Sequence, residues 1–174
     1  MKTIFLILVV ACLLCSGYLL NTKAQSQATT TVAKRKYIGL RHGPRLPPGL
    51  KEVGGGLLTD PYKDKIQFGL AHITKGTTNM LWFELGTHHD AEGHAYWEVL
   101  DVVTLPPMTR TQILFYTLCL FNDEPDPEIA AIVQPLKRGS YETKALRAWR
   151  ANRQTRKITE IPIKGVKCEM QGDD

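Results

Sequence analysis

Apolar and polar residues alternate along much of the chain from residue 66 onward, a pattern typical of β-strands with one buried face. The alternation is clear in IQFGLA at 66–71 and in LWFEL at 81–85. The segment HAYWEVLDVVTL at 94–105 is rich in aromatic and β-branched residues and ends at two prolines. Between the last two segments, residues 90–93 have the composition of a tight turn that ends in a glycine. We therefore expect a β-hairpin here.

The next segment, 112–121, is apolar at both odd and even positions. Such a run predicts a central strand buried on both faces, although a short buried helix has the same signature. The sequence NDEPDP at 122–127 predicts a turn. Residues 129–133 would then return antiparallel to the preceding strand.

Two interpretations remain open for residues 141–151, whose Ala, Leu, Lys and Arg favour a helix but whose alternation permits a strand. The tail ITEIPIKGVKC at 158–168 predicts a last edge strand, because Pro162 has no N–H to donate to a central ladder. Together these patterns predict a mostly β fold, a small antiparallel sheet or barrel-like domain with at most one helix. An α+β fold is the alternative.

The first 24 residues have the features of a secretory signal peptide. Lys2 supplies a positive charge, residues 4–20 are uncharged and mostly apolar, and small residues stand at Thr22 and Ala24. We therefore expect cleavage before Gln25 and export of the mature chain to the periplasm or out of the cell. An uncleaved membrane anchor is the alternative, because the apolar run just reaches the length of a bilayer span.

Composition divides the mature chain into a tether and one domain. Residues 25–36 offer almost no core-forming side chains, and prolines and glycines follow, so we expect 25–45 to be a flexible tether. Residues 46–174 are then a single β-rich globular domain, as the total of 174 residues suggests. With 43% hydrophobic and 22% charged residues, the chain does not belong to the class of intrinsically disordered proteins.

The cysteines predict one disulfide. Cys12 and Cys15 would leave with the signal peptide, and an oxidising compartment would favour pairing of the remaining Cys119 and Cys168. The bond would close a loop of about 49 residues, worth about 4 kcal/mol of stability by loop entropy. It requires Cα atoms about 4.4 to 6.8 Å apart. Two buried free thiols are the alternative.

Charge is distributed unevenly over the chain, whose formal net charge is +5. Residues 76–136 hold nine acidic side chains and one basic side chain, a net charge of −8. Residues 25–75 carry +6 and residues 137–174 carry +5. We expect these segments to neutralise one another within one fold, as solvated faces usually do.

The alternative is a functional basic surface on residues 137–157, which carry eight basic side chains and one acidic side chain. Its partner would be an anionic polymer or a lipid surface. Nucleic acid is not expected as a partner, because an exported protein rarely meets it.

The segment RHGPRLP, which begins at Arg41, matches the pattern RHGxRxP at every specified position. It thereby resembles the histidine acid phosphatases, in which the histidine accepts the phosphoryl group and both arginines bind it. The resemblance implies His42 as the nucleophile, Arg41 and Arg45 as phosphate ligands, and His89 with Asp90 as the family's distant His-Asp pair. The segment lies beside a proline-rich stretch without a strand-turn-helix pattern, so our main interpretation is a solvated basic loop.

A second candidate is a metal site at the predicted turn. His88 and His94 flank this turn, so their imidazoles would face each other across the hairpin, with Asp90 or Glu92 as a third ligand. Zinc, nickel or copper would accept such donors. The alternative is a polar turn that binds no metal.

Glu84 and Glu98 are the third candidate. If the turn centres near residue 91, both carboxylates lie on one face of the hairpin, about 5 to 8 Å apart. Trp82 and Tyr96 would share that face, and a carboxylate pair beside aromatic rings suits a glycosidase. The alternative is two exposed glutamates on the solvent side of a half-buried hairpin.

The strings MLWFE, YWEVLDV, DPEIAAIV, RAWRANRQT and KGVKC are similar to those of an uncharacterised family of exported cyanobacterial proteins. The resemblance runs from about Leu46 to Cys168 and implies export, but no activity. We therefore expect a binding or structural module of the cell envelope without a cofactor. The alternative is a hydrolase that uses either the RHGPRLP segment or the Glu84 and Glu98 pair.

Overall fold

The computed structural model of the protein describes residues 36–58, 66–136 and 143–168. The predicted signal peptide and residues 25–35 of the predicted tether lie outside the described residues. From residue 37 onward, the chain forms one structural unit. Within the described ranges, no helix combines the length and the apolar character needed to cross a membrane.

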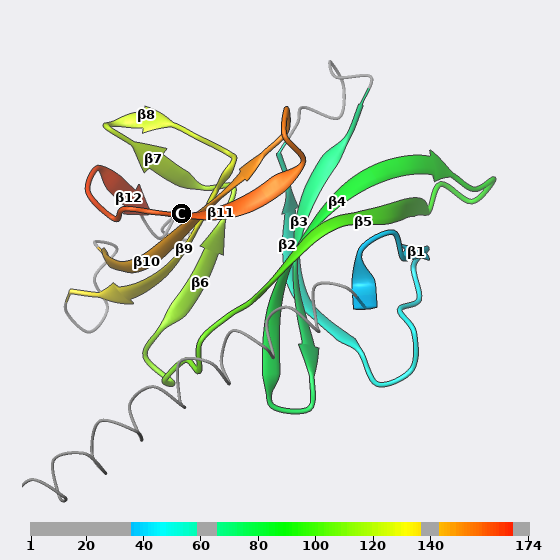
Figure 1. The fold of residues 1–174 in the computed structure, drawn as a ribbon, viewed down its shortest axis with the longest axis horizontal. Coiled ribbons are helices and arrows are strands. Elements are labelled where there is room, and N and C mark those ends of the chain that lie inside the picture. The colour runs from blue at the N-terminus through cyan, green and yellow to red at the C-terminus, as the bar shows by residue number, and fades with distance from the viewer. Residues whose placement is uncertain (1–35, 59–65, 137–142, 169–174) are drawn as a thin grey trace, which may run out of the picture. The chain divides into compact units, whose positions relative to one another are not determined.

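The first half of this unit forms a five-stranded antiparallel sheet (Figure 1). The strand order is β1-β5-β4-β3-β2, so the hairpin of β4 and β5 lies in the middle. The strands are β1 (Arg41–His42), β2 (Lys51–Leu57), β3 (Phe68–Lys75), β4 (Thr78–His89) and β5 (Ala95–Thr104).

The second half forms two smaller sheets. The four-stranded sheet has the order β11-β10-β9-β6 and the three-stranded sheet has the order β12-β7-β8. Strands of the four-stranded sheet are β6 (Ile113–Tyr116), β9 (Ile129–Pro135), β10 (Thr143–Asn152) and β11 (Lys157–Ile161). Strands of the three-stranded sheet are β7 (Cys119–Phe121), β8 (Glu124–Pro125) and β12 (Val166–Cys168).

The predicted mostly β, antiparallel fold is confirmed. All pairings among the described strands are antiparallel, and none of the three sheets closes into a barrel. The segments 66–71, 81–85 and 94–105 supply β3, β4 and β5, as their alternation predicts. The turn between β4 and β5 lies where it was expected, and its Gly93 has a φ of +86°, which residues with a side chain rarely adopt.

A β-bulge interrupts the pairing of β4 with β5. Phe83 lies opposite Asp101, but the next residue, Glu84, lies opposite Val99. Leu100 is therefore an extra residue in β5, and the pairs of Glu84, Leu85 and Gly86 are shifted by one position until a second irregularity at Thr87 of β4 restores the register. A shift of one residue exchanges the two faces of a strand, so this bulge decides which side chains of the hairpin share a face.

The prediction of one central strand over 112–121 is wrong. The segment divides into β6 and β7, which belong to different sheets, and β6 is an edge strand. Thr117 has a φ of +65°, which breaks the extended conformation between them, and Leu118 is exposed. The following residues 129–133 do return antiparallel, because β9 pairs with β6.

The structure decides the open interpretation of 141–151 for its described part, since 143–152 is strand β10. The predicted edge strand of the tail is present but divided in two. Pro162 ends β11 at the edge of the four-stranded sheet, and β12 forms an edge of the three-stranded sheet. Pairing to β9 and β11 on its two sides explains why the alternation in 143–152 prevails over its helix propensity.

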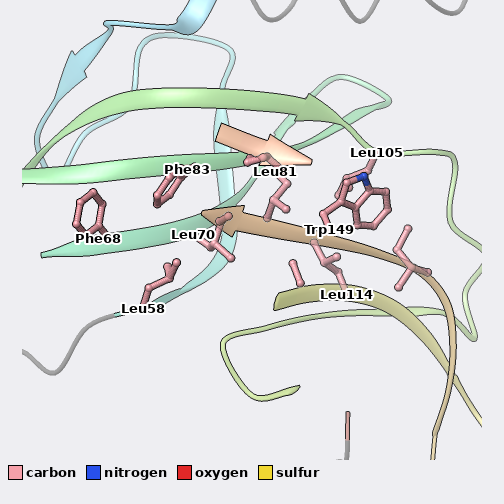
Figure 2. Packing of buried hydrophobic residues seen from close by; sticks show 12 residues of the cluster. Leu58, Phe68, Leu70, Leu81, Phe83, Leu105, Leu114 and Trp149 are labelled. Atoms are coloured by element: carbon pink, nitrogen blue, oxygen red, sulfur yellow. The ribbon is translucent and has the colours of Figure 1, made fainter. Parts of the chain in front are cut away.

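The core between the five-stranded and four-stranded sheets is a cluster of aliphatic and aromatic side chains. Figure 2 shows Leu81 of the first sheet near Trp149 of the second, and both belong to one buried cluster with Leu70. Asp101 adds a polar link between the sheets, because its fully buried carboxylate accepts a 2.9 Å hydrogen bond from the backbone N–H of Ile158. Asp101 faces this interface because it lies directly opposite Phe83, which belongs to the same buried cluster.

The predicted disulfide between Cys119 and Cys168 is confirmed. The two residues lie directly opposite each other in β7 and β12, with their Cα atoms 4.3 Å apart, at the lower limit expected for a disulfide. Both are buried in a second apolar cluster, which includes Ile129 and Val133 of β9. The bond therefore holds the last strand against the body of the domain.

The predicted tether does not extend to residue 45. Tyr37 is 8% exposed and packs in a third apolar cluster on the other face of the five-stranded sheet. Arg41 and His42 form β1, which pairs with β5. Composition misses this because the segment has few apolar residues of its own and gains its contacts from a sheet formed later in the chain.

Candidate functional site

A cavity of about 390 Å³ lies on the face of the five-stranded sheet that carries Tyr37 and Trp82. Strands β2 and β3 supply its floor, β1 and the loop after it supply one wall, and the start of β5 supplies another. Four ionisable side chains line the cavity, namely His42, Glu52, Glu84 and His94. Its volume is in the range typical of small-molecule sites.

Glycines make the floor of the cavity flat. A Cβ atom on Gly55 would lie 2.8 Å from the Leu70 carbonyl oxygen, closer than packing allows. Cβ atoms on Gly69 and Gly86 would lie 3.3 and 3.5 Å from Cζ3 of Trp97. Because Gly69 of β3 and Gly86 of β4 have no side chains, the indole of Trp97 can lie across these strands beside the cavity.

A buried ion pair closes one end of the cavity. Nε2 of His42 lies 2.8 Å from Oε1 of Glu84, and both side chains are only 6% exposed. Nδ1 of His42 lies 3.1 Å from the carbonyl oxygen of Gly43. Both partners of the ring are acceptors, so the imidazole donates from both nitrogens and carries a positive charge that the carboxylate balances.

The pKa of His42 reflects this pairing. Burial on its own lowers the pKa, but the hydrogen bond and the charge of Glu84 raise it. The hydrogen bond to Gly43 and the charge of Glu52 act in the same direction, and the net pKa is above the ordinary value of 6.5. The pairing with Glu84 therefore favours the charged form of this ring more than in a free imidazole.

The prediction that Glu84 and Glu98 share a face is wrong. Glu98 lies opposite Leu85, whereas Glu84 lies opposite Val99 on the other side of the sheet. The bulge at Leu100 causes this separation by shifting the register by one residue. The prediction that Glu84 faces solvent is wrong as well, since this residue is 5% exposed.

The aromatic residues expected beside these two glutamates are also separated. Trp82 is fully buried, with its ring centroid 5.9 Å from that of His42 and 5.1 Å from that of Tyr37. Tyr96 instead stacks on His88, with centroids 4.4 Å apart. The two aromatic side chains therefore do not form one sugar-binding surface with the two carboxylates.

The residues implied by the phosphatase resemblance do not converge. Arg41 is 78% exposed and donates from Nε to Glu98 at 2.9 Å, and Arg45 is exposed. His89 lies at the far end of β4 opposite Ala95. With both nitrogens donating, His42 presents no lone pair for attack on phosphorus in this arrangement. A nucleophilic role for His42 has no support in this geometry.

The turn of the hairpin brings some of the predicted metal ligands together. Donor atoms of Asp90, Glu92 and His94 all lie within 4.8 Å of one another. His94 is already bound to Asp90, through its backbone N–H at 2.7 Å and its Nδ1 at 3.0 Å. Desolvation raises the pKa of Asp90, but these hydrogen bonds outweigh it and lower the pKa overall. His88 is not in this group, because its ring stacks on Tyr96.

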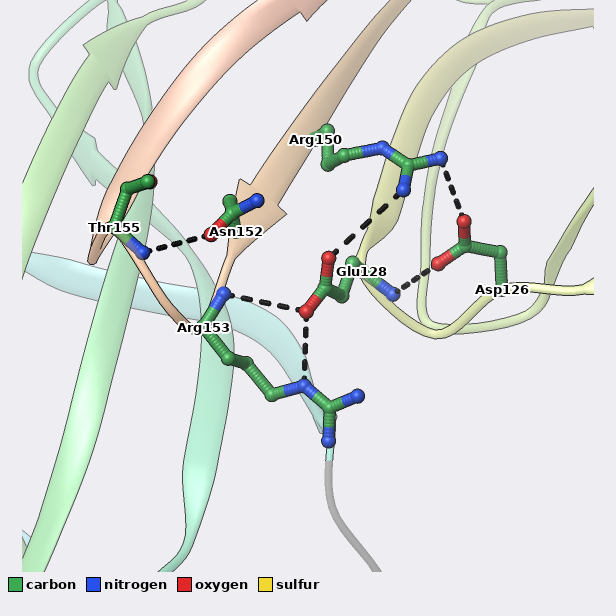
Figure 3. Close-up of polar contacts among 6 residues, drawn as sticks. All are labelled: Asp126, Glu128, Arg150, Asn152, Arg153 and Thr155. Carbon is green, nitrogen blue, oxygen red and sulfur yellow. Dashed lines mark hydrogen bonds and ion pairs between the residues drawn. The ribbon is translucent and has the colours of Figure 1, made fainter.

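Half of the basic side chains in the described part of the stretch 137–157 are paired internally. Figure 3 shows Arg150 bound to Asp126 at 2.7 Å and Arg153 bound to Glu128 at 2.9 Å. Arg147 forms two hydrogen bonds with Glu160 in β11. Residues 137–142 lie outside the described residues. The acidic middle segment thus neutralises two of these arginines, as the charge distribution predicts.

A second cavity, of about 470 Å³, lies beside this basic region. Its walls include Phe121, Pro125 and Pro162, together with Arg150. The guanidinium of Arg150 lies 5.2 Å from the ring centroid of Phe121 and is paired with Asp126. Because its central charge is already used within the fold, this cavity is a weaker candidate than the one at His42 and Glu84.

Sequence reasoning missed three features of the candidate site, which are Trp97, Glu52 and the glycine floor. Their signal was present in the glycine triplet at 54–56 and in the isolated glycines at 69 and 86, since glycine inside a strand often marks close approach of another group.

No protein-family model matches the chain, and neither a curated protein nor a solved structure matches it.

Proposed function

We propose that this chain is an exported binding module of the cell envelope, and that it binds a saccharide in the cavity beside Trp97. The observation that carries this proposal is the combination of an exposed site with a flat glycine floor, an indole across it and a buried His42–Glu84 pair at one end. The described part of the cavity has no aligned nucleophile and base, so binding is favoured over hydrolysis.

The chemistry of the cavity suits a sugar. A pyranose ring has an apolar C–H face that stacks on an indole, and the half-buried Trp97 offers one beside open space. Sugar hydroxyls both donate and accept hydrogen bonds, and the carboxylates of Glu52 and Glu84 supply acceptors while His94 supplies a further ring nitrogen.

Export is supported by separate observations. The N-terminal sequence has the three parts of a signal peptide, and the resemblance of several strings to exported cyanobacterial proteins implies the same. The Cys119–Cys168 disulfide is stable in an oxidising compartment and uncommon in the cytosol. N-terminal sequencing of the protein from its native host is expected to begin at Gln25. A protein that starts at Met1 in the membrane fraction would contradict soluble export.

Binding is tested by titrating the ¹⁵N-labelled mature protein with the trisaccharide of β-1,4-linked N-acetylglucosamine, followed by NMR. We expect shifts concentrated at Gly55, Gly69 and the indole N–H of Trp97. Trp97→Ala is expected to weaken binding at least about tenfold, because the stacking surface is lost.

The matched control is Leu118→Ala, which removes an exposed apolar side chain that does not line the cavity and is expected to leave binding unchanged. The proposal fails if no shifts occur at millimolar sugar, or if they are spread over both halves of the domain.

A further inference from the structure

The charges that line the cavity do not balance. His42 and Glu84 neutralise each other across 2.8 Å, and His94 is engaged by Asp90 at the hairpin turn. None of the described residues that line the cavity is a lysine or an arginine. Among the described side chains that line it, one carboxylate, that of Glu52, is left without a compensating charge.

Glu52 is placed over the floor by strand β2. It precedes a register irregularity between Glu52 and Gly54, and its Oε1 lies only 3.4 Å from the position that a Cβ on Gly55 would occupy. The side chain therefore leans across the glycine floor. Within the described residues, no hydrogen bond or ion pair joins its carboxylate to another side chain.

The charge of Glu52 shifts the pKa of two neighbouring groups. Burial raises the pKa of the Tyr116 hydroxyl, and the negative charge of Glu52 raises it further. The same charge helps to raise the pKa of His42. The negative charge of Glu52 therefore acts on groups at two positions around the floor on which a ligand would lie.

We infer that the saccharide bound here carries a free amino group, with its ammonium on Glu52 and its ring against Trp97. This inference rests on the proposed function and names the ligand as a hexosamine rather than a neutral or acidic sugar. An ammonium would supply the missing positive charge, and a charge-assisted hydrogen bond is stronger than one between neutral groups. The indole attracts the same cation through its ring face. An acidic sugar would face the carboxylate unfavourably.

The test compares two trisaccharides with the same backbone by isothermal titration calorimetry of the mature protein at pH 6.0. One is the β-1,4-linked glucosamine trimer and the other is its N-acetylated form. We expect the glucosamine trimer to bind about tenfold more tightly, because only it presents an ammonium. Glu52→Gln is expected to remove this preference by weakening the glucosamine trimer alone, and Glu124→Gln, which removes an exposed carboxylate outside the cavity, is expected to keep it.

Other outcomes would overturn the inference in distinguishable ways. Equal binding of both trimers, still lost in Trp97→Ala, would refute the amino-group preference and leave the saccharide site standing. Failure of both trimers to bind would refute the saccharide site as well. A simple diamine, 1,4-diaminobutane, serves as the last probe, and binding as tight as that of the glucosamine trimer would show a site for amines rather than for amino sugars.

Discussion

The five-stranded sheet and the three-stranded sheet are stabilised in different ways. Strands β4 and β5 are 12 and 10 residues long, and their side chains are buried on both faces, in the cluster of Phe83 on one side and that of Trp82 on the other. Strands β7, β8 and β12 are only 3, 2 and 3 residues long. Their few apolar contacts are supplemented by the disulfide.

This difference explains where the molecule tolerates destabilising features. The five-stranded sheet contains glycines inside strands and a buried ion pair, each of which weakens a sheet or brings a desolvation cost. Its large apolar burial offsets them, so this sheet can hold the cavity at His42 and Glu84. The three-stranded sheet has no such reserve, and its charged residues Asp123 and Lys167 pair at the surface.

The largest expected effect comes from removing the covalent link in the weaker region. The double variant Cys119→Ala, Cys168→Ala is expected to lose about 4 kcal/mol of unfolding free energy, because the unfolded chain regains the freedom of a loop of about 49 residues. Urea denaturation of the oxidised wild type and the variant measures this loss.

Hydrogen exchange locates the same effect. In the double variant, protection is expected to fall most in β7, β8 and β12 and least in β4. An equal loss of protection in both sheets would show that the three-stranded sheet is not the less stable one and that the domain opens as one unit.

A somewhat smaller loss of unfolding free energy is expected from a change in the five-stranded sheet. Glu84→Gln leaves the buried imidazolium of His42 without its counter-ion, which costs about 3 kcal/mol. The pKa of His42 is raised in the folded state, so the contribution of the pair is fully present below about pH 6.5 and is lost as the pH rises through the folded pKa.

The difference in stability between wild type and Glu84→Gln is therefore expected to be largest between about pH 5 and 6.5 and to shrink at higher pH. Thermal unfolding over this range measures it. Glu98→Gln is the matched control, because its carboxylate is more exposed and is paired with Arg41. A pH-independent difference would contradict a charged His42.

The smallest effect is expected at the partly exposed ion pairs. Arg153→Gln removes the 2.9 Å pair with Glu128 and is expected to cost about 0.5 kcal/mol, because the arginine side chain is 40% exposed and solvent screens its charge. Arg156→Gln, an exposed residue for which the described part of the chain shows no ion pair, is the control. The difference between the two is expected to disappear in 1 M salt. A loss of several kcal/mol of unfolding free energy would show that solvent does not screen the ion pair of Arg153.

Local patterns predicted the strands of the hairpin and its turn, because alternation at 81–85 and a glycine at position 93 act over a few residues. The disulfide was predicted because cleavage of the expected signal peptide would leave only two cysteines. Local patterns failed at Thr117, whose left-handed conformation divides an apolar run that has no glycine or proline to signal a break.

The candidate site was predicted only in part, for a reason that the hairpin makes clear. His42 and Glu84 were each recognised, but in separate hypotheses, and 42 residues of sequence separate them. Their contact depends on the pairing of β1 with β5 and on the bulge at Leu100. No residue type in the sequence predicts either feature. Trp97 was overlooked because its position depends on glycines in two neighbouring strands.

The Cys119–Cys168 bond also makes the chain a covalent ring that encloses β8, β9, β10 and β11. A protease that cuts one peptide bond inside this ring opens it without releasing a fragment, since both pieces remain joined through sulfur. Such a nicked molecule keeps its mass and its strand pairs until a reductant separates them. In the oxidising compartment that we propose for this domain, where proteases are present and reductants are scarce, connectivity of the C-terminal half would therefore not depend on an intact backbone.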